Sequence, residues 1–179
     1  MKAIVLSGGG SKGAYQMGVW KALKKLNIKY DIVTGTSVGA INGALMVQGE
    51  YHKAIKLWKE LSFELLFGKK DFQDVKNITD VYKVYAKNIV TSGGINPKEL
   101  EQILRLVIKE KKVRNSKINY GMVTVKVPKF KALYLSKDKI PNGKLVDYLM
   151  ASATCFPAFQ MKKINGESYI DGGFYDNMP

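Results

Sequence analysis

The sequence contains very little of the residue types that build disulfides, metal sites and histidine-based catalysis. Among its 179 residues there is one cysteine, Cys155, and one histidine, His52. A single cysteine excludes an intrachain disulfide, so a reducing, cytoplasmic environment is expected. No group of histidine, cysteine and carboxylate residues is spaced as metal ligands are, so neither a metal nor another cofactor is expected.

Long hydrophobic runs are missing as well. Met1 and Lys2 are followed by only four apolar residues, 3–6, which are too few for the core of a signal peptide. The longest uncharged stretch, 32–49, has 18 residues, but four of them are glycine and several others are polar. This composition is poor for a membrane span and favours a buried segment of a globular protein.

Acidic residues are scarce relative to basic ones. The 15 aspartates and glutamates face 29 lysines and arginines, which gives a formal net charge of +14, and only Arg105 and Arg114 are arginine. A strongly basic surface attracts polyanions such as nucleic acid or anionic lipid, although a lysine-rich surface that is merely solvated would give the same count. Because no nucleic-acid recognition motif accompanies the charge, no nucleic-acid partner is expected.

The length and the order of the predicted elements indicate one α/β domain over residues 1–179. An apolar fraction of 46% and a charged fraction of 25% are ordinary for a globular protein that buries a core. Two apolar runs typical of buried strands, 3–6 and 31–34, are each followed by a glycine-containing loop and a helical pattern, over 14–26 and 40–47. Two such strand–loop–helix units predict a parallel sheet with right-handed crossovers.

The rest of the chain adds further helices and a hairpin. Four more segments have helical periodicity: 51–61, 80–89, 97–110 (with Asn96 as N-cap) and 142–151. Alternating patterns on both sides of Pro128 and Lys129 predict a hairpin of 119–127 with 131–135, and 168–170 reads as a last short strand. Residues 62–79 mix apolar and charged side chains without a clear period.

The strongest local motif is Gly35-Thr36-Ser37-Val38-Gly39, which fits the pattern G-x-S-x-G. A serine on a sharp turn between a strand and a helix needs small neighbours, because the strained backbone packs closely against them. Such a turn exposes the hydroxyl and directs the helix N-terminus toward it, where the helix can stabilise an oxyanion. We therefore expect Gly35 and Gly39 to form a nucleophile elbow around Ser37, with a plain glycine–serine turn as the alternative.

A second motif, the glycine-rich loop Gly8-Gly9-Gly10-Ser11-Lys12-Gly13, lies between the first predicted strand and helix. Its backbone N–H groups suit an anion, either a phosphate or the oxyanion of a tetrahedral intermediate. Its glycines also fit the dinucleotide-binding pattern G-x-G-x-x-G, which requires an acidic residue at the end of the second strand. The candidate, Asp31, stands at the start of that strand, so a dinucleotide site is disfavoured.

The third motif, Asp171-Gly172-Gly173, directly follows the last predicted strand. A Ser–His–Asp triad would need a histidine near Ser37, but His52 lies beyond the end of the following helix and is interpreted as a surface residue. A carboxylate can act as the base instead, if burial raises its pKa and it hydrogen-bonds the hydroxyl. Asp171 is the natural candidate for that base, and an ordinary glycine turn is the alternative.

Together these motifs resemble the patatin-like phospholipase family, in its bacterial form. The resemblance rests on the glycine-rich loop with Lys12, the G-x-S-x-G and D-G-G motifs, and the absence of a catalytic histidine. Two further runs, Ala151-Ser152-Ala153-Thr154-Cys155-Phe156-Pro157-Ala158-Phe159 and Asp176-Asn177-Met178-Pro179, are similar to the family motifs A-S-x-x-x-P-x-x-F and D-N-x-P. Family domains commonly continue past the last motif, so a catalytic domain truncated at its C-terminal end is one expectation for residues 1–179.

The resemblance implies a three-layer α/β/α fold with a mainly parallel central sheet, and a lipid acyl hydrolase that uses a Ser–Asp dyad. Ser37 would attack the ester carbonyl while Asp171 takes its proton, and the loop, chiefly around Gly9 and Gly10, would hold the oxyanion. The substrates would be fatty-acyl esters of phospholipids or neutral lipids. A catalytically silent α/β domain that binds lipid or nucleotide is the alternative.

Access to lipid is expected to come from reversible contact with a membrane surface. The charge of +14 would attract anionic lipid, and the aromatic stretch from Phe63 to Phe72, edged by Lys69 and Lys70, would add apolar contact. The same aromatic residues would equally suit a core. The expected location is therefore cytoplasmic, with peripheral binding at the membrane.

Overall fold

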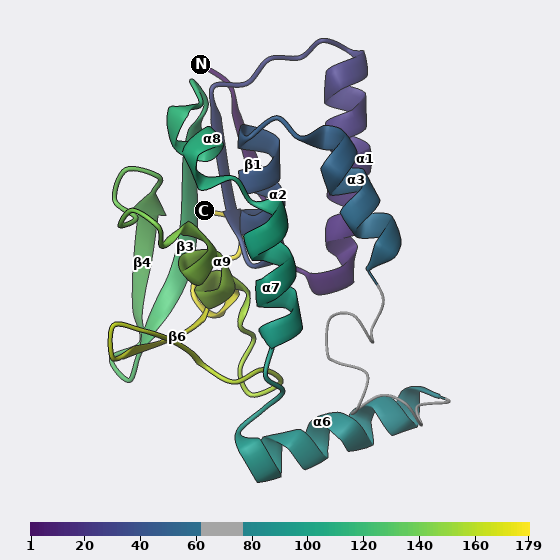
Figure 1. Cartoon of the computed structure of the whole chain (residues 1–179), viewed down its shortest axis with the longest axis vertical. Coiled ribbons are helices and arrows are strands. Elements are labelled where there is room, and N and C mark those ends of the chain that lie inside the picture. The colour runs from purple at the N-terminus through teal and green to yellow at the C-terminus, as the bar shows by residue number, and fades with distance from the viewer. Residues whose placement is uncertain (62–76) are drawn as a thin grey trace.

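The computed structural model describes residues 1–61 and 77–179, and in it helices pack on a twisted sheet (Figure 1). The described strands are β1 (Ala3–Leu6), β2 (Ile32–Thr36), β3 (Asn119–Val127), β4 (Lys131–Ser136), β5 (Lys162–Ile164) and β6 (Glu167–Asp171). Their order is β1-β2-β3-β6-β5, and β4 also pairs with β3. The pairings of β1, β2 and β3 are parallel, and those of β4, β5 and β6 are antiparallel. The expected α/β class and the β3–β4 hairpin are confirmed.

All the described α-helices except α6 cover one face of this sheet in two layers. They are α1 (Gly13–Lys25), α2 (Val38–Val47), α3 (Tyr51–Glu60), α6 (Ile78–Ser92), α7 (Lys98–Val107), α8 (Glu110–Asn115) and α9 (Leu145–Ala153). Helices α2 and α9 pack directly on the strands, and α1, α3 and α7 pack against those two. Helix α6 extends away from the others at the bottom of Figure 1.

Helix α2 lies close to the sheet because its residues are small. Nine residues, from Gly39 to Val47, are buried. Gly43 faces the strands, where a Cβ would come within 3.1 Å of Val33 and 3.2 Å of Tyr120. The uncharged stretch of the sequence is therefore buried protein, as expected. Within residues 1–61 and 77–179, no helix is long and apolar enough to cross a membrane.

The opposite face of β2 is covered by the last residues of the chain. Thr34 and Thr36 alternate along β2 with the core-facing Val33. The Thr34 hydroxyl donates to the carbonyl of Pro179, and the Thr36 hydroxyl donates to the carbonyl of Asp176 at 2.8 Å. Over β2, this second face is thus packed against an extended segment, whereas the first face is packed against helices.

One expected helix ends earlier than predicted. The helix expected over 97–110 ends at Val107, and a separate helix that was not expected, α8, begins at Glu110. The Gln48 amide bridges the break, because its Nε2 donates to the Val107 carbonyl at 3.0 Å and its Oε1 accepts from the Lys109 N–H at 2.8 Å. These bonds replace the helical ones that the break removes.

Other expectations differ in smaller ways. The N-cap of α7 is Pro97 rather than Asn96, and no side chain caps this end. Strand β5 was not expected, because three residues are too few to show an alternating pattern; it forms by pairing with β6. The aromatic stretch from Phe63 to Phe72, with Lys69 and Lys70, lies outside the described residues.

Candidate active site

Strand β3 changes its neighbour at the point where the two candidate catalytic residues meet. Thr36, the last residue of β2, lies opposite Val123, and the next β3 residue, Thr124, pairs with Asp171 at the end of β6. Since β4 occupies the other edge of β3 here, β2 and β6 share one edge. Strand β2 is parallel to β3 and β6 is antiparallel, so they run toward each other and end at adjacent rungs. Ser37, which follows Thr36, is thereby brought beside Asp171.

Ser37 occupies the strained turn that the G-x-S-x-G motif predicts. Its backbone has φ 56° and ψ −129°, a conformation that costs an L-residue on the order of 1–3 kcal/mol. A Cβ at Gly35 would come within 2.4 Å of the Gly39 carbonyl, and a Cβ at Gly39 within 2.2 Å of the Leu6 carbonyl oxygen. Both positions therefore require glycine. The turn places Ser37 at the N-terminus of α2, beside the ends of β1 and β2.

Asp171 is buried and held through both its backbone and its side chain. It is 6% exposed, its N–H donates to the Thr154 carbonyl at 2.8 Å, and its Oδ1 accepts from the Gly173 N–H at 2.7 Å. Burial raises the pKa of the carboxyl and outweighs the hydrogen bonds from the Ser37 side chain and the Gly173 N–H, which lower that pKa. Gly172 must be glycine, because a Cβ there would come within 2.3 Å of a carbonyl oxygen of β3.

The glycine-rich loop lies directly against Ser37. A Cβ on Gly8 would come within 3.0 Å of the Ser37 Cβ. The Gly8 N–H donates to Asn177 Oδ1 at 2.9 Å, which ties the loop to the segment after Asp171. Gly10, with φ 56°, opens the short turn Gly10–Lys12 that leads into α1. The loop, the elbow and the D-G-G segment are thus assembled at one end of the sheet.

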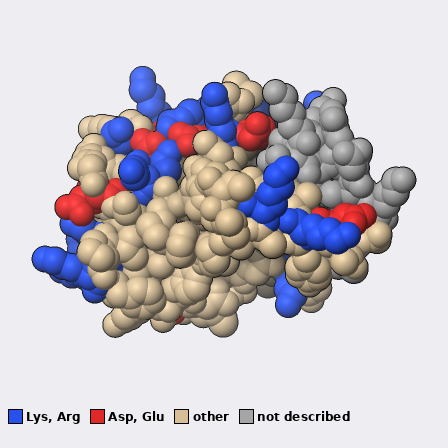
Figure 2. Space-filling model, turned by 90° about the horizontal axis from the view of Figure 1, so that it is seen from below, with Lys and Arg blue, Asp and Glu red and all other residues tan. Residues whose placement is uncertain are grey.

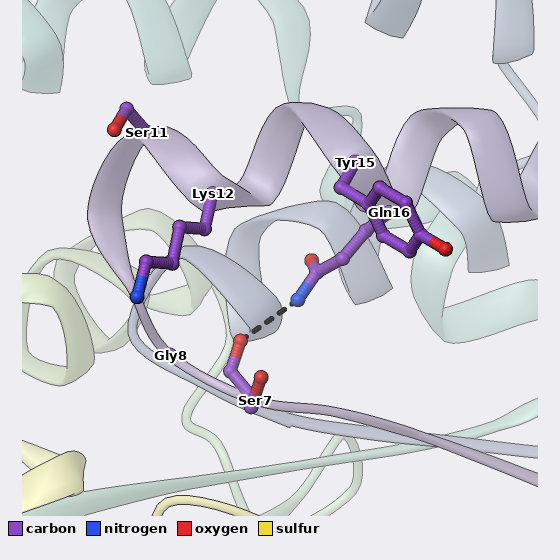
Figure 3. A pocket seen from close by; sticks show the side chains of 6 residues that line it. All are labelled: Ser7, Gly8, Ser11, Lys12, Tyr15 and Gln16. Atoms are coloured by element: carbon purple, nitrogen blue, oxygen red, sulfur yellow. Dashed lines mark hydrogen bonds between the residues drawn. The ribbon is translucent and has the colours of Figure 1, made fainter.

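A cavity of about 500 Å³ opens beside this loop and the first turn of α1 (Figure 3). It is lined by Ser7, Gly8, Ser11, Lys12, Tyr15 and Gln16. Gln16 Nε2 donates to the Ser7 carbonyl at 2.8 Å, and the Lys12 side chain runs beside the loop that carries Gly8 (Figure 3). An ammonium group, hydroxyls and an aromatic ring therefore border the loop on its open side.

Asn42 is a buried residue of the site that motif reasoning misses. It is fully buried on α2, and its Nδ2 donates to the Gly13 carbonyl at 3.0 Å and to Gln16 Oε1 at 2.8 Å. Its Oδ1 accepts from Trp58 Nε1 at 2.9 Å. One amide thus fixes α1, α2 and α3 relative to one another just behind the loop. The available signal was an asparagine within a helix otherwise made of apolar and small residues, since buried amides require partners.

Two other polar residues considered in the sequence analysis, His52 and Asp31, lie away from the candidate active site. His52 is exposed on α3, where its ring meets the edge of Tyr51 with centroids 5.5 Å apart. Asp31 accepts from the Lys2 N–H at 2.7 Å at the start of β2, whereas the glycine-rich loop follows the end of β1. A ribose held by Asp31 could not reach phosphates bound at the loop, which removes support from the dinucleotide interpretation.

Comparisons with known proteins show the family and the fold of this chain. A family model described as "Patatin-like phospholipase" matches residues 4–179. Patatin-like phospholipase domain-containing protein 7 of Rattus norvegicus is 28% identical over 185 residues, and protein 6 of Homo sapiens is 28% identical over 181 residues. Each match covers 99% of this chain but 12% of the relative, so the chain spans about an eighth of those proteins. Lysophospholipase nte1 of Aspergillus terreus is 57% identical over 42 residues, 24% of this chain and 3% of that protein.

Solved structures with a similar fold include VipD from Legionella pneumophila, with a TM-score of 0.66 and 20% identity over 99% of this chain and 47% of that one. The type III effector protein ExoU has a TM-score of 0.52 and 15% identity over 84% of this chain and 38% of that one. The fold and the site define an α/β protein in which an elbow serine faces a buried carboxylate and a glycine-rich loop. The chain belongs to the patatin-like phospholipase family.

Proposed function

We propose that this chain is a serine lipid acyl hydrolase that cleaves fatty-acyl esters through a Ser37–Asp171 dyad. The observation that carries the proposal is the meeting of these two residues at the facing ends of β2 and β6, beside the glycine-rich loop. Family membership, and relatives named as phospholipases or lysophospholipases, support a lipid ester as the substrate. Phospholipids and neutral lipids both fit this class.

The reaction proceeds in two halves. Ser37 Oγ attacks the ester carbonyl carbon while Asp171 accepts the hydroxyl proton. Collapse of the tetrahedral intermediate breaks the ester bond, the leaving alcohol takes the proton from Asp171, and the acyl group stays on Ser37. Asp171 then accepts a proton from the water that attacks the acyl-enzyme. When the second tetrahedral intermediate collapses, that proton passes from Asp171 to Ser37 Oγ and the fatty acid is released. Burial raises the pKa of Asp171, which makes its carboxylate a stronger base than an exposed aspartate.

The loop from Gly8 to Gly13 stabilises the oxyanion, and its residues have different roles. The Gly8 N–H is occupied by Asn177, so the amides around Gly9 and Gly10 hold the oxyanion, assisted by the N-terminus of α2. Ser11 and Lys12 line the adjoining cavity, where an ammonium group favours a substrate with a negatively charged or polar headgroup.

Contact with a lipid surface fits the distribution of charge on one side of the molecule. Figure 2, which views the molecule from below, shows a broad area without charged residues, with lysines and arginines along its margin. On α6, Tyr82, Ile89 and Val90 are exposed, and the same helix carries Lys83 and Lys87. Apolar side chains beside lysines favour reversible, peripheral binding to anionic lipid.

Labelling with a fluorophosphonate probe, followed by peptide mapping, tests the proposal. The probe should modify Ser37 in the wild-type chain, because only an activated serine reacts with it at a useful rate. A catalytically silent lipid- or nucleotide-binding domain is the competing function. That domain would leave Ser37 unmodified and would give no burst with an activated ester, and either result would overturn the proposal.

A further inference from the structure

Ser152, near the end of α9, places a buried hydroxyl between two backbone groups of the site. The side chain is fully buried. Its Oγ accepts from the Ser37 N–H at 2.9 Å and donates to the Val123 carbonyl at 2.6 Å. A carbonyl can only accept and an N–H can only donate, so both directions are fixed and the hydroxyl proton is committed to Val123.

The two groups that Ser152 bridges would bond to each other if β2 continued along β3. At the start of their pairing the Asn119 N–H donates to the Asp31 carbonyl at 2.8 Å, which directs the backbone groups of every second β3 residue, up to Val123, toward β2. With Thr36 opposite Val123, the next bond of this ladder would join the Ser37 N–H to the Val123 carbonyl. The hydroxyl of Ser152 is inserted into that position.

The bridge is not the bond that a helical serine ordinarily makes. A serine or threonine inside a helix commonly donates to the carbonyl four residues earlier, and Thr154, at the end of the same helix, donates to the Met150 carbonyl at 2.6 Å. Ser152 instead donates across to β3. Helix α9 is also anchored on its far side, where Asp147 forms ion pairs with Arg105 at 2.6 Å and Lys162 at 3.4 Å. The helix that carries the Ser152 hydroxyl is therefore held in place by these ion pairs.

The inserted hydroxyl separates the end of β2 from β3 at the point where β6 arrives. Two hydrogen bonds in series span the distance that one direct bond would otherwise close. We propose that Ser152 is a positioning residue that sets the separation of Ser37 and Asp171. It does so by standing between the Ser37 N–H and the Val123 carbonyl, which would otherwise bond directly. The catalytic meaning of this role rests on the proposed function.

Replacement of Ser152 by alanine tests the role. The Ser37 N–H loses its acceptor or rebonds directly to Val123, and in both cases Ser37 moves relative to Asp171. We expect kcat for a soluble acyl ester to fall by about 10- to 100-fold, as small misplacements of reacting groups do, with little change in KM. The rate of fluorophosphonate labelling at Ser37 should fall in parallel.

The pH profile supplies a readout that a merely structural role would not move. The hydrogen bond from Ser37 lowers the pKa of Asp171, so weakening that bond should shift the acid limb of kcat/KM to higher pH. Tyr120→Phe is the matched control, because it removes a buried hydroxyl that donates to the Ala40 carbonyl at 2.7 Å without touching the Ser37 N–H. It should lower stability while leaving the acid limb in place.

Ser152→Cys serves as a second variant in case the alanine variant does not fold, since a thiol has similar shape but makes weaker hydrogen bonds. Its kcat should lie between those of the wild type and the alanine variant. Wild-type kcat and an unshifted acid limb in a folded Ser152 variant would overturn the inference.

Failure of the proposed function gives a different result, because the wild type would then neither hydrolyse the ester nor be labelled. In that case a changed rate of amide hydrogen exchange at Ser37 in the variant would still support the bridge, and an unchanged rate would refute it.

Discussion

Gly8 and Asn177, near opposite ends of the chain, are joined by a hydrogen bond of 2.9 Å from the Gly8 N–H to Asn177 Oδ1. The contact is so close that a Cβ on Gly8 would come within 2.7 Å of the same oxygen. The bond occupies one amide of the glycine-rich loop and fixes where the loop begins. The position of the amides that follow it therefore depends on the segment after Asp171.

Replacing Asn177 by alanine should consequently weaken catalysis without removing any group that contacts substrate. We expect kcat/KM for a soluble p-nitrophenyl acyl ester to fall by about tenfold, because the loop amides lose their fixed orientation. Met178→Ala, next in the chain with a side chain that is 65% exposed, is the control and should retain activity. Equal kcat/KM in the two variants would show that the Gly8–Asn177 bond does not organise the loop.

Two helical glycines, Gly39 of α2 and Gly18 of α1, should respond oppositely to alanine. A Cβ at Gly39 would meet the Leu6 carbonyl oxygen at 2.2 Å, whereas a Cβ at Gly18, in the middle of α1, would meet nothing within 4 Å. Chemical denaturation should show Gly39→Ala destabilised by about 1–3 kcal/mol or more, and Gly18→Ala stabilised by about 0.5–1 kcal/mol through helix propensity. A Gly39→Ala variant as stable as the wild type would contradict the close packing of the elbow on β1.

The Asp171→Asn variant should lose activity but gain stability at pH 7. Burial raises the pKa of Asp171 in the folded chain, so between the unfolded and folded pKa values the folded chain binds more protons than the unfolded one. Wild-type stability then falls as pH rises through this window. The asparagine variant lacks this loss, so it should be the more stable protein at pH 7, with the difference disappearing at acid pH. Urea unfolding of both proteins across pH measures this, and a variant less stable at pH 7 would contradict the burial of a charged carboxylate.

Lipid binding should depend on salt if the lysines act as proposed. Vesicle co-sedimentation should show binding to anionic vesicles and little binding to zwitterionic ones, because each lysine near an anionic surface contributes about 1 kcal/mol. Binding should weaken several-fold as salt rises to about 0.5 M, since the Debye length shortens. A double variant of α6, Tyr82→Ser with Val90→Ser, should weaken the part of vesicle binding that does not depend on salt. Absence of any preference for anionic vesicles at low salt would show that the net charge does not contribute to lipid binding.

The residues of the site that could be predicted from the sequence are those with local signatures. Ser37 and its flanking glycines lie within one short motif, and the strand before it and the helix after it carry clear periodicity. Asp171 could be selected because the sequence contains a single histidine and because two glycines follow the aspartate. In each case the physical requirement, a strained turn or a close approach, leaves glycine in adjacent positions.

The contacts of the supporting residues could not be predicted, because their partners lie far along the chain. Ser152 bonds a residue 115 positions away and Asn177 bonds one 169 positions away, and no local pattern reports such bonds. The same holds for Gln48, whose side chain bridges the break between α7 and α8. The antiparallel half of the sheet also depends on long-range pairing, which periodicity within one strand does not specify.

The central claim, that Ser37 is the nucleophile and Asp171 its base, is tested most directly by steady-state hydrolysis of a p-nitrophenyl acyl ester. The wild type is compared with Ser37→Ala, Asp171→Asn and His52→Ala, each confirmed as folded by circular dichroism. The account predicts that the first two variants lose about 10²-fold or more in kcat, while His52→Ala, altered at an exposed residue of α3, keeps wild-type activity. Turnover by Ser37→Ala within about tenfold of the wild type, or loss of activity in a folded His52→Ala variant, would contradict it.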